Sequence, residues 1–339
     1  MGSARHASAR RRLWAPLLAG ALLLLLAATA DATTVLAAAR AGRGALRGFA
    51  GPRTRRPADP LARERFYVDP GDAASLAVDS LRAEGDDADA GALEAIANQP
   101  QAIWLTSDGS AATVRGVVAA AAAARRVPIF VIYNLPGRDC GSYSAGGAAG
   151  EGDYSAFIDR VVSGLGQHRA VVIVEPDALS ETCMPPGTDA LIRVAIARLD
   201  TDARAAIYVD AGNPGWQAPA AEAQGLAAVV GSARAGFAVN VSNFYPVSAD
   251  LAYGTAISEL LGGRHFVIDT SRDGGDVTPG QWCNPTGAAL GAPPTTRTGS
   301  PLVDAELWIK QPGESDGTCD GGPPAGQFWL SGALALVGR

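Results

Sequence analysis

The sequence has few histidines and cysteines, the residues that most often bind zinc. It contains three histidines (His6, His168 and His265) and four cysteines, none of which forms a Cys-x-x-Cys pair. A zinc site needs a tighter spacing of such ligands, so no metal and no cofactor is expected. The formal net charge is -6, and the body of the chain has no basic stripe, which argues against nucleic-acid binding. A neutral or polar small ligand fits better.

The beginning of the chain is typical of an exported protein. Arginines precede an apolar run from Leu13 to Ala28 that ends in small residues, so residues 1–32 are expected to be a signal peptide. The alternative is an uncleaved membrane anchor, but the run is slightly short for a span. Residues 33–60, rich in Ala, Gly, Arg and Pro, are predicted to form a flexible basic leader. Residues 61–339 are then the folded domain, and the protein is expected to be secreted.

The cysteines agree with export, because all four follow the signal segment. Two disulfides are predicted, most simply Cys140 to Cys183 and Cys283 to Cys319, each joining loops at strand ends. The spacing alone does not fix this connectivity.

Short apolar runs alternate with Ala-rich helical stretches, which is typical of βαβ units and a parallel sheet. Seven runs are predicted to be strands: 102–105, 128–133, 170–175, 205–209, 236–241, 265–268 and 305–309. Helices are expected at 154–165, at 189–199 and within 72–97, the last on either side of an acidic loop at Asp86 to Asp89. Seven strands with helical crossovers favour an α/β fold, a parallel (β/α) barrel in one domain.

Polar or aromatic residues follow every predicted strand, at the end where a parallel barrel carries its active site. Pro176 ends the strand that begins near Val171 and leaves Asp177 at this rim. The alternative is that Asp177 only caps the following helix. The rim residues predict a cleft and are Trp104, Thr106, Tyr133, Asn134, Asp177, Asp210, Ser242, Asn243, Asp269 and Lys310.

Asp139 lies in a loop shaped by Gly and Pro and tethered by Cys140. If Asp139 lies near Asp177, its charge raises the pKa of Asp177, as a general acid working near neutral pH requires. The alternative is a surface ion pair between Arg138 and Asp139.

The segment from Lys310 to Asp316 contains a cation and two carboxylates after the last strand. Lys310 and Glu314 suit hydrogen bonds to sugar hydroxyls, and Asp316 could orient or deprotonate a water; the alternative is an acidic solvated loop. Flat aromatic faces pack against pyranose rings, so the tryptophans at or beyond strand ends indicate a glycan. These are Trp104, Trp216, Trp282 and Trp308, of which Trp308, like Trp329 near the C-terminus, suits the core equally well.

These residues resemble glycoside hydrolase family 6, the inverting β-1,4-glucanases that include endoglucanases and cellobiohydrolases. The resemblance runs from about Phe66 to Leu334 and rests on six segments in order: 133–140, 174–177, 210–212, 240–244, 282–285 and 310–316. It implies a distorted seven-stranded barrel, and the two disulfides predicted above fit the family as well.

By this resemblance, Asp177 is the general acid and Asp139 is the aspartate that tunes it and helps relay a proton. Asp316 matches the residue often proposed as the base, Tyr133 lies beneath the distorted sugar, and Ser144 holds the water. The implied substrate-binding residues are Trp104, Asp210, Asn213, Trp216, Asn243, Trp282, Lys310 and Glu314. Asn213 stands where the family often has histidine, so one subsite is expected to differ in affinity or pH response.

The sequence therefore predicts a secreted endo-β-1,4-glucanase that acts on β-1,4-glucan or cello-oligosaccharide by single displacement with inversion, without metal or cofactor. Short loops after Asp177 and before Asp316 favour endo action. The alternatives are a cellobiohydrolase, a retaining glycosidase, and a glycan-binding protein that has lost catalysis. A monomer without a protein partner is expected.

Overall fold

The computed structural model describes residues 59–107, 109–201 and 204–339, which belong to one compact unit. The predicted signal peptide and the leader up to residue 58 lie outside the described residues. Within the described ranges, no helix is both long and apolar enough to cross a membrane.

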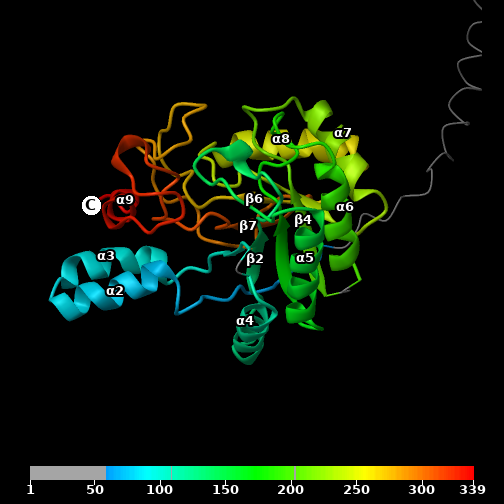
Figure 1. The fold of residues 1–339 in the computed structure, drawn as a ribbon. Helices are drawn as coiled ribbons and strands as arrows, with labels where there is room; N and C mark the ends of the chain where they lie inside the picture. The colour runs from blue at the N-terminus through cyan, green and yellow to red at the C-terminus, as the bar shows by residue number, and fades with distance from the viewer. Residues whose placement is uncertain (1–58, 108, 202–203) are drawn as a thin grey trace, which may run out of the picture. The chain divides into compact units, whose positions relative to one another are not determined.

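The centre of the unit is one sheet of seven parallel strands in chain order (Figure 1). The strands are β1 (Ile103–Leu105), β2 (Ile129–Ile132), β3 (Ala170–Val174), β4 (Ala205–Asp210), β5 (Gly236–Val239), β6 (Phe266–Asp269) and β7 (Val303–Leu307). All seven predicted strands occur within two residues of their expected bounds. The residues before β1 and after β7 pair through one isolated bridge, between Gln101 and Trp308, instead of a continuous ladder. This weak closure is the distortion that was expected of the barrel.

In the described part of the chain, two α-helices precede β1, one follows each of β1 to β5, and one follows β7. They are α2 (Ala73–Glu84), α3 (Asp87–Ala97), α4 (Ala111–Ala123), α5 (Glu151–Leu165), α6 (Thr188–Leu199), α7 (Pro219–Val230), α8 (Val247–Leu260) and α9 (Leu330–Leu336). The prediction of an acidic loop at Asp86 to Asp89 is wrong. Asp86 caps α3 by accepting from the backbone N–H of Asp89, and Asp87 and Asp89 lie in the first helical turn. Carboxylates there stabilise the positive end of the helix dipole.

The strands are buried on both faces, as their apolar runs predict. Along β3, Val171 and Ile173 pack inside the barrel, and Val172 and Val174 pack against the helices outside. A third cluster joins α2, α3 and α9 around Trp308. The helices therefore cover the outer face of the sheet, and the carboxyl ends of the strands stay free to carry a site (Figure 1).

Both predicted disulfides are present. Cys140 joins Cys183, with Cα atoms 5.8 Å apart, and Cys283 joins Cys319, with Cα atoms 6.2 Å apart. Each bond ties together two loops that follow different strands, so it limits the movement of residues at the carboxyl ends of the strands.

Candidate active site

A cleft of about 560 Å³ lies at the carboxyl ends of the strands. Eleven of the thirteen predicted site residues line it: Trp104, Tyr133, Asp139, Ser144, Asp177, Trp216, Asn243, Trp282, Lys310, Glu314 and Asp316. A larger cavity, of about 800 Å³, lies at the amino-terminal ends of β3 to β6, with several arginines in its wall. It contains none of the predicted residues, so the smaller cleft is the candidate site.

Asp177 stands at the end of β3 in a backbone conformation that few residues adopt. Its φ is 73° and that of Glu175 is 49°, on the two sides of Pro176. Such strain collects at functional sites. Burial raises the pKa of Asp177 well above its usual range, and the charges of Asp210, Glu181 and Asp139 add to the effect in that order. The raised pKa was expected, but Asp139 is the smallest of these causes.

The loop after β2 holds Asp139 beside this acid. The carboxylate of Asp139 accepts from the backbone N–H of Ser144. Arg138 donates to the carbonyl oxygens of Ser144 at 2.8 Å and of Tyr133 at 2.7 Å, so its guanidinium braces the loop instead of forming the surface ion pair considered from the sequence. Burial raises the pKa of Asp139, while the hydrogen bond from Ser144 and the charge of Arg138 lower it.

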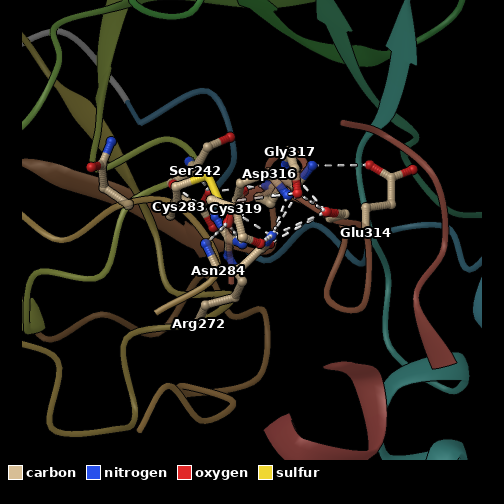
Figure 2. Close-up of polar contacts among 12 residues, drawn as sticks. Ser242, Arg272, Cys283, Asn284, Glu314, Asp316, Gly317 and Cys319 are labelled. Carbon is tan, nitrogen blue, oxygen red and sulfur yellow. Dashed lines mark hydrogen bonds and ion pairs between the residues drawn. A yellow bond between two sulfur atoms is a disulfide. The ribbon is translucent and has the colours of Figure 1, made fainter. Parts of the chain in front are cut away.

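Asp316 occupies the opposite wall in a buried ion pair. Arg272 Nη1 lies 2.9 Å and 2.8 Å from the two carboxylate oxygens, and the two side chains are 4% and 6% exposed. The backbone N–H of Asn284 donates to a carboxylate oxygen of Asp316, and the side-chain oxygen of Asn284 accepts from the backbone N–H of Asp316 (Figure 2). Arg272 and Asn284 together make three contacts to the Asp316 carboxylate, which has about four acceptor positions, so little of its acceptor capacity is left for a water.

An aromatic group forms a third part of the wall. Trp104 and Tyr133 meet edge to face, with ring centroids 5.2 Å apart. The ammonium of Lys310 lies 5.9 Å from the Trp104 ring centroid and 3.2 Å from a carboxylate oxygen of Glu314. Trp216 and Trp282 also line the cleft, and they are 43% and 42% exposed. Exposed indole rings beside polar groups suit a sugar, whose faces are apolar and whose edge is polar.

The structure does not place Asp210 and Asn213 among the residues that line the cleft. Asp210 is 1% exposed, and its carboxylate accepts the backbone N–H of Asp177 at 2.8 Å and of Gly212 at 3.1 Å. Asn213 is fully buried and accepts from the N–H of Gly215. Both side chains serve backbone groups beneath the wall.

Two further carboxylates act as similar braces. Glu175 accepts from the backbone N–H groups of Asn134 and Leu135, and so joins the end of β3 to the end of β2. Asp269 accepts from the N–H groups of Ser242 and Lys310, and so joins β6 to β5 and β7. Buried carboxylates that satisfy several N–H groups hold the strand ends in register.

Glu181 is a cleft residue that the sequence reasoning missed. Its carboxylate lies near the sulfur atoms of Cys140 and Cys183, all within 4.8 Å of one another. The disulfide uses both sulfurs, so this group is no thiolate site for a metal. The only signal in the sequence was its position four residues after Asp177, on the short turn that follows.

A parallel barrel whose cleft combines a carboxyl group of raised pKa, further carboxylates and exposed tryptophans defines a glycoside hydrolase. The chain belongs to glycosyl hydrolase family 6, which its residues 61–339 match.

Known proteins of this family resemble the whole folded unit. The chain is 40% identical over 284 residues to endoglucanase A of Cellulomonas fimi, covering 82% of this chain but only 62% of that protein. It is 40% identical over 298 residues to endoglucanase 1 of Streptomyces halstedii, covering 83% of this chain and 91% of that one. A solved structure of endoglucanase Cel6 from Mycobacterium tuberculosis, in complex with a thio-linked cellobioside, is 47% identical with a TM-score of 0.77. That match covers 82% of this chain and 98% of the other.

Proposed function

We propose that this protein is a secreted endo-β-1,4-glucanase that hydrolyses internal bonds of cellulose-type glucans with inversion. The observation that carries the proposal is the raised pKa of Asp177 in a cleft it shares with Asp139 and exposed tryptophans. A carboxyl group that keeps its proton near neutral pH is what protonation of a glycosidic oxygen needs.

The reaction is a single displacement. Asp177 gives its proton to the glycosidic oxygen, the bond from that oxygen to the anomeric carbon breaks, and a water attacks this carbon from the opposite face. The water loses a proton toward the Asp139 and Ser144 side of the cleft. Asp139 is the better placed acceptor, because Arg272 and Asn284 take up most of the acceptor capacity of Asp316, whereas Asp139 accepts one N–H, that of Ser144.

The other cleft residues orient the glucan. Tyr133 lies under the reacting sugar, Trp104, Trp216 and Trp282 pack against sugar rings, and Lys310 bonds to hydroxyls. Glu314, Asn243 and Ser144 complete the polar contacts. Asp210 and Asn213 contribute indirectly, because they bind backbone N–H groups of the residues beneath the cleft wall.

Endo action is supported by the names of the relatives at 40% and 47% identity, which are endoglucanases. The test compares the fall in viscosity of carboxymethylcellulose with the release of reducing ends. An internal cutter lowers viscosity after few cleavages, whereas a cellobiohydrolase releases reducing ends with little loss of viscosity.

A further inference from the structure

The loop that follows β2 reaches across to the opposite wall through one aromatic side chain. The ring of Tyr143 lies 6.0 Å from that of Trp282, centroid to centroid, at an angle of 58°. It also lies directly on Gly317, where an added Cβ would be only 2.4 Å from the Tyr143 Cγ and 2.7 Å from its Cδ1. Real Cβ atoms do not approach so closely, so this contact needs a glycine at position 317.

The two sides of this contact belong to the two catalytic walls. Tyr143 immediately precedes Ser144, whose backbone N–H binds the carboxylate of Asp139. Gly317 immediately follows Asp316, as Figure 2 shows. The Tyr143 ring is thus the aromatic link between the segment that carries Asp139 and the segment that carries Asp316.

The segment of Asp139 and the segment of Asp316 are each fixed at a second point, away from the Tyr143 ring. Cys140 fixes the first through its disulfide to Cys183. On the other side, the side-chain amide of Asn284 donates to the carbonyl oxygens of Gly317 and Cys319, at 2.8 Å and 3.0 Å. Because each segment is fixed at this second point, the contact between Tyr143 and Gly317 sets the distance between the two segments across the cleft.

Tyr143 has no part in the folding core. It is 46% exposed, it belongs to none of the hydrophobic clusters of the described residues, and it lines the cleft. An aromatic ring left half in water at a cleft is typical of a binding surface.

We propose that Tyr143 is a positioning residue, which holds the loop of Asp139 and Ser144 against Gly317 and Trp282 and so fixes the width of the cleft around one glucosyl unit and its attacking water. This inference rests on the proposed function of the same cleft. Its main consequence is for kcat, because small misplacements of reacting groups are costly.

The test is a double-mutant cycle with Tyr143→Ala and Gly317→Ala on the full chain. Tyr143→Ala should lower kcat on cello-oligosaccharides roughly tenfold to a hundredfold, with a smaller change in KM. Tyr143→Phe should recover most of the loss, because the ring and not the hydroxyl makes the contact. Gly317→Ala should cost less in the Tyr143→Ala background than in the wild type, since no ring is left to displace.

The matched control is Leu260→Ala, an exposed apolar side chain on α8 that is 60% exposed and does not line the cleft. It should leave kcat unchanged. Additive effects of the two substitutions, or a Tyr143→Phe protein as slow as Tyr143→Ala, would overturn the proposal. A wild-type protein that cleaves no β-1,4-glucan would instead refute the proposed function. The same cycle, read by thermal unfolding, would then still test the ring contact by itself.

Discussion

The backbone N–H of Glu181 donates to the carbonyl oxygen of Asp177 at 3.0 Å, so the two carboxyl groups lie one turn apart in the same cleft. One oxygen of Glu181 is buried without a hydrogen-bond partner among the described residues. Burial and the charge of Asp139 raise the pKa of Glu181, and the charge of Glu181 in turn helps raise the pKa of Asp177. Glu181 is therefore part of the electrostatic setting of the proposed acid.

We predict that Glu181→Gln shifts the alkaline limb of the pH profile of kcat/KM to lower pH. Removing a negative charge lowers the pKa of Asp177, so the acid loses its proton earlier as the pH rises. The profiles of wild type and variant give the shift directly. Glu259→Gln, an exposed change on α8, is the control. An unmoved alkaline limb in Glu181→Gln would contradict this coupling.

The ion pair of Arg272 with Asp316 is expected to matter for stability as well as for the site. Arg272 also donates to the carbonyl oxygen of Ser242 and lies 4.2 Å over the ring of Phe244. Arg272→Ala leaves a buried carboxylate unpaired and should cost about 3–5 kcal/mol of unfolding free energy.

Arg272→Lys should fall between the wild type and Arg272→Ala, because one ammonium can pair with Asp316 but has no planar guanidinium to bind the carbonyl oxygen of Ser242 and lie over Phe244 as well. The control is Arg82→Ala, which removes a pair with Glu94 whose side chains are 51% and 42% exposed, and which should unfold like the wild type. Denaturant titration measures all three variants. Equal stability of Arg272→Ala and wild type would rule out this role.

Lys310 is the only lysine of the chain and lies in the cleft beside Glu314 and Trp104. An amine-acylating reagent should therefore inactivate the protein in proportion to acylation of this residue, followed by peptide mass spectrometry. Acylation removes the charge and a hydrogen-bond donor to sugar hydroxyls. A cello-oligosaccharide should slow both processes together. Full activity of protein acylated at Lys310 would remove it from the binding residues.

The buried acid Asp250 on α8 gives a prediction about stability and pH. Neither of its carboxylate oxygens has a partner among the described residues, and burial raises its pKa to about 9, helped by the charges of Asp273 and Asp269. The unfolded chain releases this proton near pH 4. The stability contributed by Asp250 is thus complete below about pH 4 and is lost as the pH rises toward about 9.

Asp250→Asn has no proton to lose and should therefore unfold at a higher temperature than wild type, with a gain that grows between about pH 5 and pH 9. Calorimetry at several pH values measures the difference. Asp79→Asn, an exposed change on α2, should show no such trend. A difference in unfolding temperature between Asp250→Asn and wild type that shrinks as the pH rises would contradict this prediction.

The strands and most of the cleft could be predicted from the sequence, because apolar runs and rim residues are local patterns, whereas the spacing of the cysteines left their pairing open. The roles of the rim carboxylates could not be predicted. Asp177, Asp210 and Asp269 all follow or end a buried strand, yet only Asp177 opens into the cleft. Which carboxylate turns inward to bind neighbouring N–H groups depends on how adjacent strands pair, and the local pattern of one strand does not reveal that pairing.

Contacts between residues distant in the chain could not be predicted from the sequence for the same reason. Arg272 and Asp316, or Tyr143 and Gly317, are distant in the chain and meet only because two loops cross at the barrel rim. The acidic stretch at Asp86 to Asp89 was misjudged because acidic residues suit both a solvated loop and the first turn of a helix.

The central claim is that Asp177 donates the proton in an inverting cleavage, and proton NMR of the first product tests it most directly. Wild type and Asp177→Ala are mixed with a soluble cello-oligosaccharide, and the anomeric signals are followed before mutarotation. If Asp177 is the acid of an inverting cleavage, wild type gives an initial α-anomer and the variant gives none. An initial β-anomer, or an α-anomer formed as fast by Asp177→Ala, would contradict it.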